Sequence, residues 1–309
     1  MKQICYAVVF GIAGLLPALP QTGAGPFLGR WDITITTPNV SYPDWMEVSE
    51  KDGQLSARVQ PRGGSVHPAA GVKLEGSHLL VTVSAATADG PGVNWDLIGS
   101  GDSISGTQEH GDATAQIAGI RAPALKHNTP KSWSKPESLF NGKDLTGWEP
   151  DDPKINHWVA QDGVLLNESH GANLKTTRKF DDFRLHIEFN CPEEGNSGVY
   201  LRGRYEVQVE YEKPGTEDPF HGMGSVYGML APSVELPRKA GQWESFDIML
   251  AGRNVTISRN GVKTVDNKEI PGITGGALDA NEGEPGPFYI QGDHTGGMKY
   301  RNIMVSVPK

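Results

Sequence analysis

Three polar side chains alternate along one predicted strand in the second half of the chain. Within residues 205–210, Glu206, Gln208 and Glu210 fall on one face and the two intervening valines on the other. This pattern fits the solvated side of a strand, and it equally fits a sugar-binding face, because sugars need dense hydrogen-bonding groups. A carboxyl group on such a face could also move protons.

A second polar group follows a predicted strand near the C-terminus, in the run Gln291-Gly292-Asp293-His294. Imidazole has an ordinary pKa of about 6.5 and exchanges protons at neutral pH, so His294 is the first candidate for a catalytic base or acid. The alternative is a loop histidine that bonds the backbone. Asp293 could orient the imidazole or bind a cation, and Gln291 could bind substrate.

Aromatic residues and a histidine extend this set. Tyr227, Trp148 and Trp243 are better explained as core or structural residues than as ligand-stacking ones. The functional alternative for Tyr227 is that its small neighbour Gly228 allows close approach of a ligand. His221 lies in a loop, 220–224, that follows the Pro- and acid-rich run 213–219 and could form a wall of the pocket.

No spacing motif in the sequence demands a metal ion. A divalent metal remains possible, because a fold could bring together four potential ligands: Glu206, His221, Asp293 and His294.

The elements that must position these residues are short strands. After residue 138 the candidate strands are 163–166, 183–189, 198–201, 205–209, 245–250, 254–259, 262–264, 288–291 and 300–307, and Asn260-Gly261 is a strong two-residue hairpin signal. We expect a sandwich of two antiparallel sheets over 138–309.

The first half of the chain has the same character. Candidate strands at 30–36, 45–48, 55–59, 72–74, 78–83, 93–97 and 103–107 are separated by Gly and Asp-Gly turns. They predict a small antiparallel barrel or sandwich over 25–122, and the start Gly29-Arg30-Trp31-Asp32 resembles that of lipocalin-like barrels. Residues 123–137 lack periodicity and indicate a linker.

Composition limits the classes of function. The 309 residues carry a formal net charge of -9 without a Lys/Arg cluster, which argues against a nucleic-acid binder. Residues 1–24 have the basic start, apolar run and small residues of a signal peptide; a membrane anchor is the alternative. Export to the periplasm or medium would leave Cys191 as the one cysteine, and no later run is apolar enough to span a membrane.

Six blocks in the second half together resemble the 3-keto-disaccharide hydrolase domain family. They are 138–148 (SLFNGKDLTGW), 195–202 (GNSGVYLR), 205–209 (YEVQV), 224–228 (GSVYG), 241–243 (GQW), and 286–294 (GPFYIQGDH) with 300–303 (YRNI). The resemblance covers about residues 138–309 and implies a concanavalin-like jelly roll. Two departures are Glu210, where the family usually has Asp, and a longer turn at 295–297.

The resemblance implies an exported enzyme that cleaves 3-keto-glycosides. A base removes the proton on carbon 2, next to the ketone, the group on carbon 1 is eliminated, and addition of water completes a net hydrolysis. The implied catalytic residues are His294, Glu206 and Arg202, of which Arg202 could stabilise an enolate oxygen or merely pair with Glu206. The implied substrate-binding residues are Gln208, Glu210, Tyr227, Gln291, Asp293 and His221.

The implied reaction needs no cofactor, and its substrate could be supplied by a sugar 3-dehydrogenase. The rival hypothesis is a non-catalytic, lectin-like protein, because concanavalin-like jelly rolls also serve as carbohydrate-binding modules. A structural or adhesive role for residues 25–122 is a third possibility.

Overall fold

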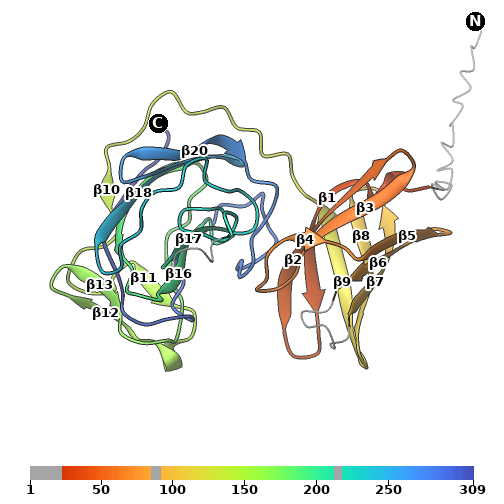
Figure 1. Ribbon diagram of the computed structural model, residues 1–309, viewed down its shortest axis with the longest axis horizontal. Coiled ribbons are helices and arrows are strands. Elements are labelled where there is room, and N and C mark those ends of the chain that lie inside the picture. The colour runs from red at the N-terminus through yellow and green to blue at the C-terminus, as the bar shows by residue number, and fades with distance from the viewer. Residues whose placement is uncertain (1–22, 85–91, 212–217) are drawn as a thin grey trace, which may run out of the picture.

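The computed structural model describes residues 23–84, 92–211 and 218–309. The predicted signal peptide falls almost entirely on residues outside these ranges and stays a prediction. No helix in the described part of the chain is long and apolar enough to cross a membrane. Apart from two short 3-10 turns, η1 (Gly25–Phe27) and η2 (Pro153–Ile155), the regular elements are β-strands, which form two bodies side by side (Figure 1).

The first body is a closed barrel. Its strands are β1 (Gly29–Thr36), β2 (Ser41–Lys51), β3 (Gln54–Gln60), β4 (His67–Pro68), β5 (Gly71–Glu75), β6 (His78–Val83), β7 (Val93–Ser100), β8 (Ser103–His110) and β9 (Ala113–Arg121), in the order β4-β3-β2-β1-β9-β8-β7-β6-β5. The amides of Ala69 and Ala70 donate to Ala57 O and Thr82 O, at 2.9 and 2.7 Å, and so join the two edges of the sheet. The expected small antiparallel domain is therefore a barrel.

Strand β9 has no counterpart among the predicted strands, because its inward residues are small. Ala115, Ile117 and Gly119 face the barrel interior, and a Cβ at position 119 would lie 2.6 Å from Ile104 Cγ1. Close packing in the barrel interior leaves room only for glycine at position 119. Glycine is uncommon within strands, so it weakens the sequence signal for this strand.

The second body is a two-sheet sandwich, which confirms the all-β jelly-roll prediction. Its strands are β10 (Glu137–Ser138), β11 (Trp148–Pro150), β12 (Trp158–Gln161), β13 (Val164–Asn167), β14 (Leu174–Thr176), β15 (Phe183–Asn190), β16 (Asn196–Leu201), β17 (Tyr205–Glu210), β18 (Trp243–Ala251), β19 (Asn254–Arg259), β20 (Val262–Glu269), β21 (Tyr289–Ile290) and β22 (Met298–Ser306). One sheet has the order β12-β13-β22-β15-β18-β19-β20, with β10 on β22, and the other has β11-β14-β21-β16-β17. The predicted hairpin at Asn260-Gly261 joins β19 to β20 with positive φ at both residues.

The predicted linker lies along the sandwich (Figure 1). The amide of Arg253 donates to Leu125 O at 3.1 Å, and His127 Nδ1 lies 2.8 Å from Asp182 Oδ1. Further on, the amide of Ser134 donates to Val307 O at 2.8 Å. These contacts could not be predicted from the sequence. They are made by backbone groups and by a single polar side chain, which leave no periodic pattern.

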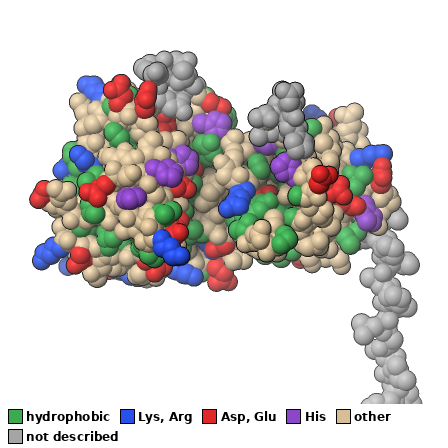
Figure 2. Space-filling model, turned by 90° about the horizontal axis from the view of Figure 1, so that it is seen from below, with side chains coloured by type: hydrophobic (Ala, Val, Ile, Leu, Met, Phe, Trp, Pro, Cys, Tyr) green, Lys and Arg blue, Asp and Glu red, His purple; other side chains and the backbone are tan. Residues whose placement is uncertain are grey.

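Barrel and sandwich pack closely against each other (Figure 2). Trp45 of β2 is fully buried in the hydrophobic core of the sandwich. On the sandwich side, a Cβ at Gly272 would lie 2.1 Å from Trp45 Nε1, and one at Gly275 would lie 2.2 Å from Gly64 O. A larger side chain at Gly272 or Gly275 would clash with the barrel at these distances. Glycine at these two positions therefore allows the barrel to contact the sandwich closely.

A candidate active site between barrel and sandwich

A small cavity opens where the sandwich faces the barrel. It measures about 120 Å³ and is lined by side chains from β16, β17, the segment after β21 and the barrel. The lining residues are Gly63, Asn196, Tyr200, Glu206, Gln208, Tyr227, Gly275, Gly276, Gln291, Asp293 and His294. Six of the nine predicted site residues are therefore brought together here: Glu206, Gln208, Tyr227, Gln291, Asp293 and His294.

The alternation along β17 holds in the structure. Val207 and Val209 are fully buried in the sandwich core, and the other face carries Glu206 and Gln208, which are each 4% exposed. These polar residues therefore do not form the solvated side of a strand. With its amide oriented to satisfy both neighbours, Gln208 donates to Ser197 O at 3.2 Å and to Glu206 Oε1 at 3.1 Å.

Glu206 is a buried carboxyl group with an altered acidity. Burial, opposed by a hydrogen bond with Tyr200 and assisted by the nearby charge of Asp293, raises its pKa to about 8. A Cβ at Gly198, on the neighbouring strand, would lie 2.1 Å from Glu206 Oε1. Glycine at 198 therefore makes room for a carboxyl group that is largely protonated at neutral pH.

Asp293 and His294 form a hydrogen-bonded pair on the rim. His294 Nδ1 lies 2.8 Å from Asp293 Oδ1, and both side chains are about half exposed. Burial alone would raise the pKa of Asp293, but hydrogen bonds from His294 and Asn173 outweigh it and hold the pKa below its ordinary value. The same bond from Asp293 raises the pKa of His294. When Nδ1 donates its proton to Asp293, Nε2 carries the lone pair that can accept one.

Asn173, just before β14, holds this pair in place and was missed by sequence reasoning. Its Oδ1 accepts the amides of Gly292 and Asp293 at 2.7 and 3.2 Å, and its Nδ2 donates to Asp293 Oδ2 at 3.3 Å. Asp151 Oδ2 in turn accepts from Asn173 Nδ2 at 3.0 Å. A lone asparagine more than a hundred residues from its partner gives no sequence signal.

The remaining polar lining supplies hydrogen-bonding groups. Gln291 is 8% exposed, and its Oε1 has no hydrogen-bond partner among the described residues. Tyr200, also missed from the sequence, donates its hydroxyl to Gly275 O at 2.9 Å. Tyr227 packs against His221 with the ring centroids 4.9 Å apart. A buried acceptor without a partner costs free energy, which a bound hydroxyl group could recover.

Arg202 does not line the cavity. Its guanidinium is fully buried elsewhere and donates to Asp181 Oδ1 at 3.0 Å and to Gly252 O at 3.2 Å. Arg202 and Glu206 are four residues apart and would share a face of one continuous strand. They do not, because β16 ends at Leu201 and Arg202 sits in the following turn with φ of +53°. The position of Arg202 fits neither stabilisation of an enolate oxygen nor a pair with Glu206.

Glu210 and His221 also lie outside the lining. Glu210 is fully buried at the end of β17, where it accepts the amide of Met223 at 3.0 Å and pairs with Arg238. His221 Nδ1 lies 3.1 Å from Asp218 Oδ2, and the ring reaches the cavity only through Tyr227. Both residues hold the 218–224 loop beside the site. Part of the acid-rich run before this loop falls outside the described residues.

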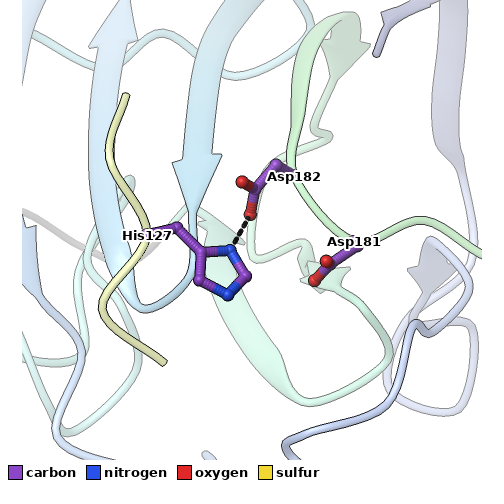
Figure 3. Close-up of side chains that lie close together, drawn as sticks. All are labelled: His127, Asp181 and Asp182. Carbon is purple, nitrogen blue, oxygen red and sulfur yellow. Dashed lines mark hydrogen bonds and ion pairs between the residues drawn. The ribbon is translucent and has the colours of Figure 1, made fainter. Parts of the chain in front are cut away.

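The four side chains considered as metal ligands do not form a compact cluster. Within the described ranges, three or more ligand-type side chains lie within 4.8 Å of one another only at His127, Asp181 and Asp182 (Figure 3). There, Asp182 Oδ1 accepts the amide of Gly252 at 2.8 Å, and Asp181 is bonded to the Arg202 guanidinium. The contact between His127 and Asp182 fastens the linker segment 123–137 to the sandwich, and the Arg202 guanidinium beside Asp181 disfavours a second cation.

The cavity thus combines an acid and a base on one wall. Glu206 has a raised pKa and retains its proton at neutral pH, whereas His294 presents a nitrogen oriented by an ionised aspartate. His294 can therefore accept a proton from one atom of a ligand, and Glu206 can donate a proton to another atom.

Comparisons with known proteins show similarity over the second half of the chain. The sequence profile described as the 3-keto-alpha-glucoside-1,2-lyase-like domain matches residues 135–306. Two similar solved structures are proteins from Parabacteroides distasonis ATCC 8503 assigned as glycosyl hydrolases. One is 30% identical, with a TM-score of 0.49, and covers 56% of this chain and 83% of its own. The other is 21% identical, with a TM-score of 0.44, and covers 55% and 92%.

No curated protein matches the sequence. The profile match spans more than half of the chain and includes every cavity residue except Gly63. The chain therefore carries a glycoside-hydrolase-like domain, and it belongs to the 3-keto-disaccharide hydrolase family, whose domain is described as 3-keto-alpha-glucoside-1,2-lyase-like.

Proposed function

We propose that this protein cleaves 3-keto-glycosides by removal of the proton on carbon 2, elimination of the group on carbon 1, and hydration of the product. The observation that carries the proposal is the meeting of Glu206 and the Asp293–His294 pair in one cavity. An ordinary glycosidase flanks the glycosidic bond with two carboxyl groups. A histidine oriented by aspartate and facing a protonated glutamate suits proton abstraction next to a ketone better.

In the proposed reaction, His294 Nε2 takes the proton from carbon 2. The electron pair of the C–H bond forms the enolate, and Glu206 donates its proton to the oxygen that leaves carbon 1 as the C–O bond breaks. Addition of one water, with hydroxide to carbon 1 and a proton to carbon 2, gives the free 3-keto-sugar. His294 and Glu206 exchange roles in this second step, which restores both to their starting protonation states.

The polar lining supports sugar recognition. Gln291 Oε1 lacks a partner within the described residues and can accept a hydroxyl proton, and Tyr227 and Asn196 offer further polar groups. Gln208 is held by Ser197 O and Glu206, so it also orients the acid. A lining rich in polar side chains favours a carbohydrate over an apolar ligand.

The same proposal includes the location of the enzyme and the source of its substrate. The signal-like residues 1–24 support export to the periplasm or medium. The reaction needs a ketone at carbon 3, which an oxidation of the corresponding glycoside, such as that by a sugar 3-dehydrogenase, must supply.

The direct test is incubation of purified protein with 3-keto-trehalose and methyl 3-keto-α-glucoside, followed by mass spectrometry. We expect release of glucose and methanol, respectively, together with an unsaturated 3-keto-sugar or its hydrate. The lectin hypothesis predicts binding of both compounds with no release. Turnover of the unoxidised glycosides at the same rate would show that the ketone is irrelevant and would overturn the proposed mechanism.

A further inference from the structure

The barrel supplies one wall of the cavity. Gly63, in the loop 61–66 between β3 and β4, lines the same space as Glu206 and His294. This loop lies on the side of the barrel that faces the sandwich (Figure 1). The family match begins only at residue 135, so this wall lies outside the matched domain.

The loop is held rigidly from the barrel side. Gln60 Nε2 donates to Gly64 O at 3.1 Å, and the amide of Gly64 donates to Pro61 O at 3.1 Å. The guanidinium of Arg62 lies over the ring of Tyr42, 5.0 Å from its centroid. A loop tied by its own backbone and side chains can present a fixed surface to a ligand.

The sandwich holds the same loop from the other side. A Cβ at Gly275 would lie 2.2 Å from Gly64 O, and one at Gly228 would lie 2.9 Å from Ser65 Cβ. Val66 packs against the core of the sandwich. Gly275 also lines the cavity, and Gly228 follows the lining residue Tyr227, so the loop is docked at the site itself.

We propose that the barrel loop 61–66 is a substrate wall that restricts the group on carbon 1 to small substituents. This inference rests on the proposed function. The cavity of about 120 Å³ is well below the range of about 300–1,000 Å³ typical of pockets for larger ligands. A disaccharide exceeds this volume, so part of it must extend beyond the lining to which Gly63 contributes. The barrel is thus a specificity element of the enzyme.

The test introduces a side chain at the wall. Gly63 has φ of +66°, and a Cβ there would meet no atom within 4 Å, so Gly63→Trp directs bulk into open space. Gly53→Trp is the matched control, because Gly53 is also a barrel glycine with positive φ, +76°, and open surroundings, but it lies in the β2–β3 turn outside the lining. Gly63→Asn is a smaller change that tolerates positive φ better if the tryptophan variant misfolds.

The readout is the ratio of kcat/KM for 3-keto-trehalose to that for methyl 3-keto-α-glucoside. We expect Gly63→Trp to lower this ratio about 10-fold or more, the scale of a steric clash of 1–2 kcal/mol, and Gly63→Asn to lower it less. Gly53→Trp should keep the native ratio. An unchanged ratio in a folded Gly63→Trp protein overturns the wall proposal.

A binding measurement separates this proposal from the proposed function. If native protein cleaves neither ketone, the proposed function fails, and calorimetric titration with unoxidised trehalose and methyl α-glucoside then tests the wall. Selective loss of trehalose affinity in Gly63→Trp, with Gly53→Trp unaffected, supports the wall without catalysis. Equal affinities in all three proteins, or no binding of either sugar to native protein, overturn it.

Discussion

Two clusters of ionisable groups in the described part of the chain differ in access and in pairing. The cavity cluster consists of Glu206, Asp293 and His294. The interface cluster joins Asp32 of the barrel to Glu282 and Arg253 of the sandwich; Asp32 is 2% exposed and Glu282 is fully buried. Both clusters contain a carboxyl group with a strongly raised pKa.

In the interface cluster, both carboxylate oxygens of Glu282 are bonded to other buried side chains. Arg253 Nη2 lies 2.5 Å from Glu282 Oε2, and the Tyr205 hydroxyl donates to Glu282 Oε1 at 2.7 Å. In the cavity cluster, by contrast, the His294 side chain is about half exposed. A shifted pKa by itself therefore indicates only that a carboxyl group is buried. Access for a ligand, together with a base and an acid facing one space, is what favours catalysis.

The largest expected effect is loss of His294. His294→Ala should lower turnover of a 3-keto-glycoside by about 100-fold or more, the usual scale for a positioned acid or base. Stability should change little, because the residue is on the rim. Steady-state kinetics with melting curves measures both.

His186→Ala is the control for this change. His186 Nδ1 makes a similar contact with Asp247, at 2.7 Å, on a partly exposed face outside the cavity lining. Native turnover in His294→Ala would transfer the role of base to Glu206. Equal losses in both histidine variants would point to a general effect on the fold.

Removal of the acid at Glu206 should change the pH profile as well as the rate. In the proposed mechanism turnover rises as His294 loses its proton and falls as Glu206 ionises, near its pKa of about 8. Glu206→Gln should lower turnover by about 100-fold and abolish the alkaline limb. Rates measured from pH 5 to 10 test this.

Glu210→Gln is the matched variant on the same face of β17, since Glu210 is buried outside the cavity lining. It should retain the alkaline limb even if the loss of its pair with Arg238 lowers stability. If the fall in turnover at alkaline pH persists in Glu206→Gln, ionisation of another group causes it.

Sequence reasoning located the β17 residues because strand geometry fixes the direction of alternate side chains. It located the 291–294 run, which follows β21, by the proton-exchanging chemistry of His294. It misplaced Arg202, since the parity of a strand does not continue through a turn with positive φ. Alternation thus predicts residues on a regular strand and fails at the turn that precedes β17.

Asn173 and Gly63 could not be predicted for a different reason. Asn173, just before β14, bonds the lining residue Asp293, and Gly63 lines the cavity from a barrel loop, so both depend on packing between segments far apart in the chain. Such contacts depend on the topology of the sandwich and on docking of the barrel. Neither leaves a periodic or motif-like trace at the residue itself.

Asn173 provides a smaller test of the cavity cluster. Asn173→Ala removes the acceptor of the Gly292 and Asp293 amides, so the Asp293–His294 pair should be less well positioned. We expect kcat to fall about 10-fold with little change in KM, because misplacement of a catalytic group mainly affects the transition state.

Asn156→Ala is the control for Asn173→Ala, because Asn156 also accepts a backbone amide, that of Trp158 at 3.1 Å, outside the cavity lining. If both variants lose stability and kcat together, Asn173 has only a structural role. A lower kcat in Asn173→Ala with a native melting temperature supports positioning.

The smallest expected effect concerns the interface cluster and should appear in stability alone. Burial, together with the nearby Glu282, raises the pKa of Asp32. The folded protein therefore keeps a proton that the unfolded chain releases above about pH 4. The folded state binds more protons, so this group's contribution to stability declines as the pH rises from about 4 toward the raised pKa. Asp32→Asn, which keeps the shape and cannot ionise, should remove that decline.

Melting temperatures at pH 5 and pH 8.5 test this prediction. Relative to native protein, the melting temperature of Asp32→Asn should be about 2–4 °C higher at pH 8.5 than at pH 5, the shift expected for roughly 1 kcal/mol in a chain of this size. Turnover should stay native at both pH values, since Asp32 does not line the cavity. Parallel melting profiles would mean that Asp32 is ionised in the folded protein. A loss of turnover in Asp32→Asn would mean that the interface cluster acts on the site, so the two clusters would no longer be independent.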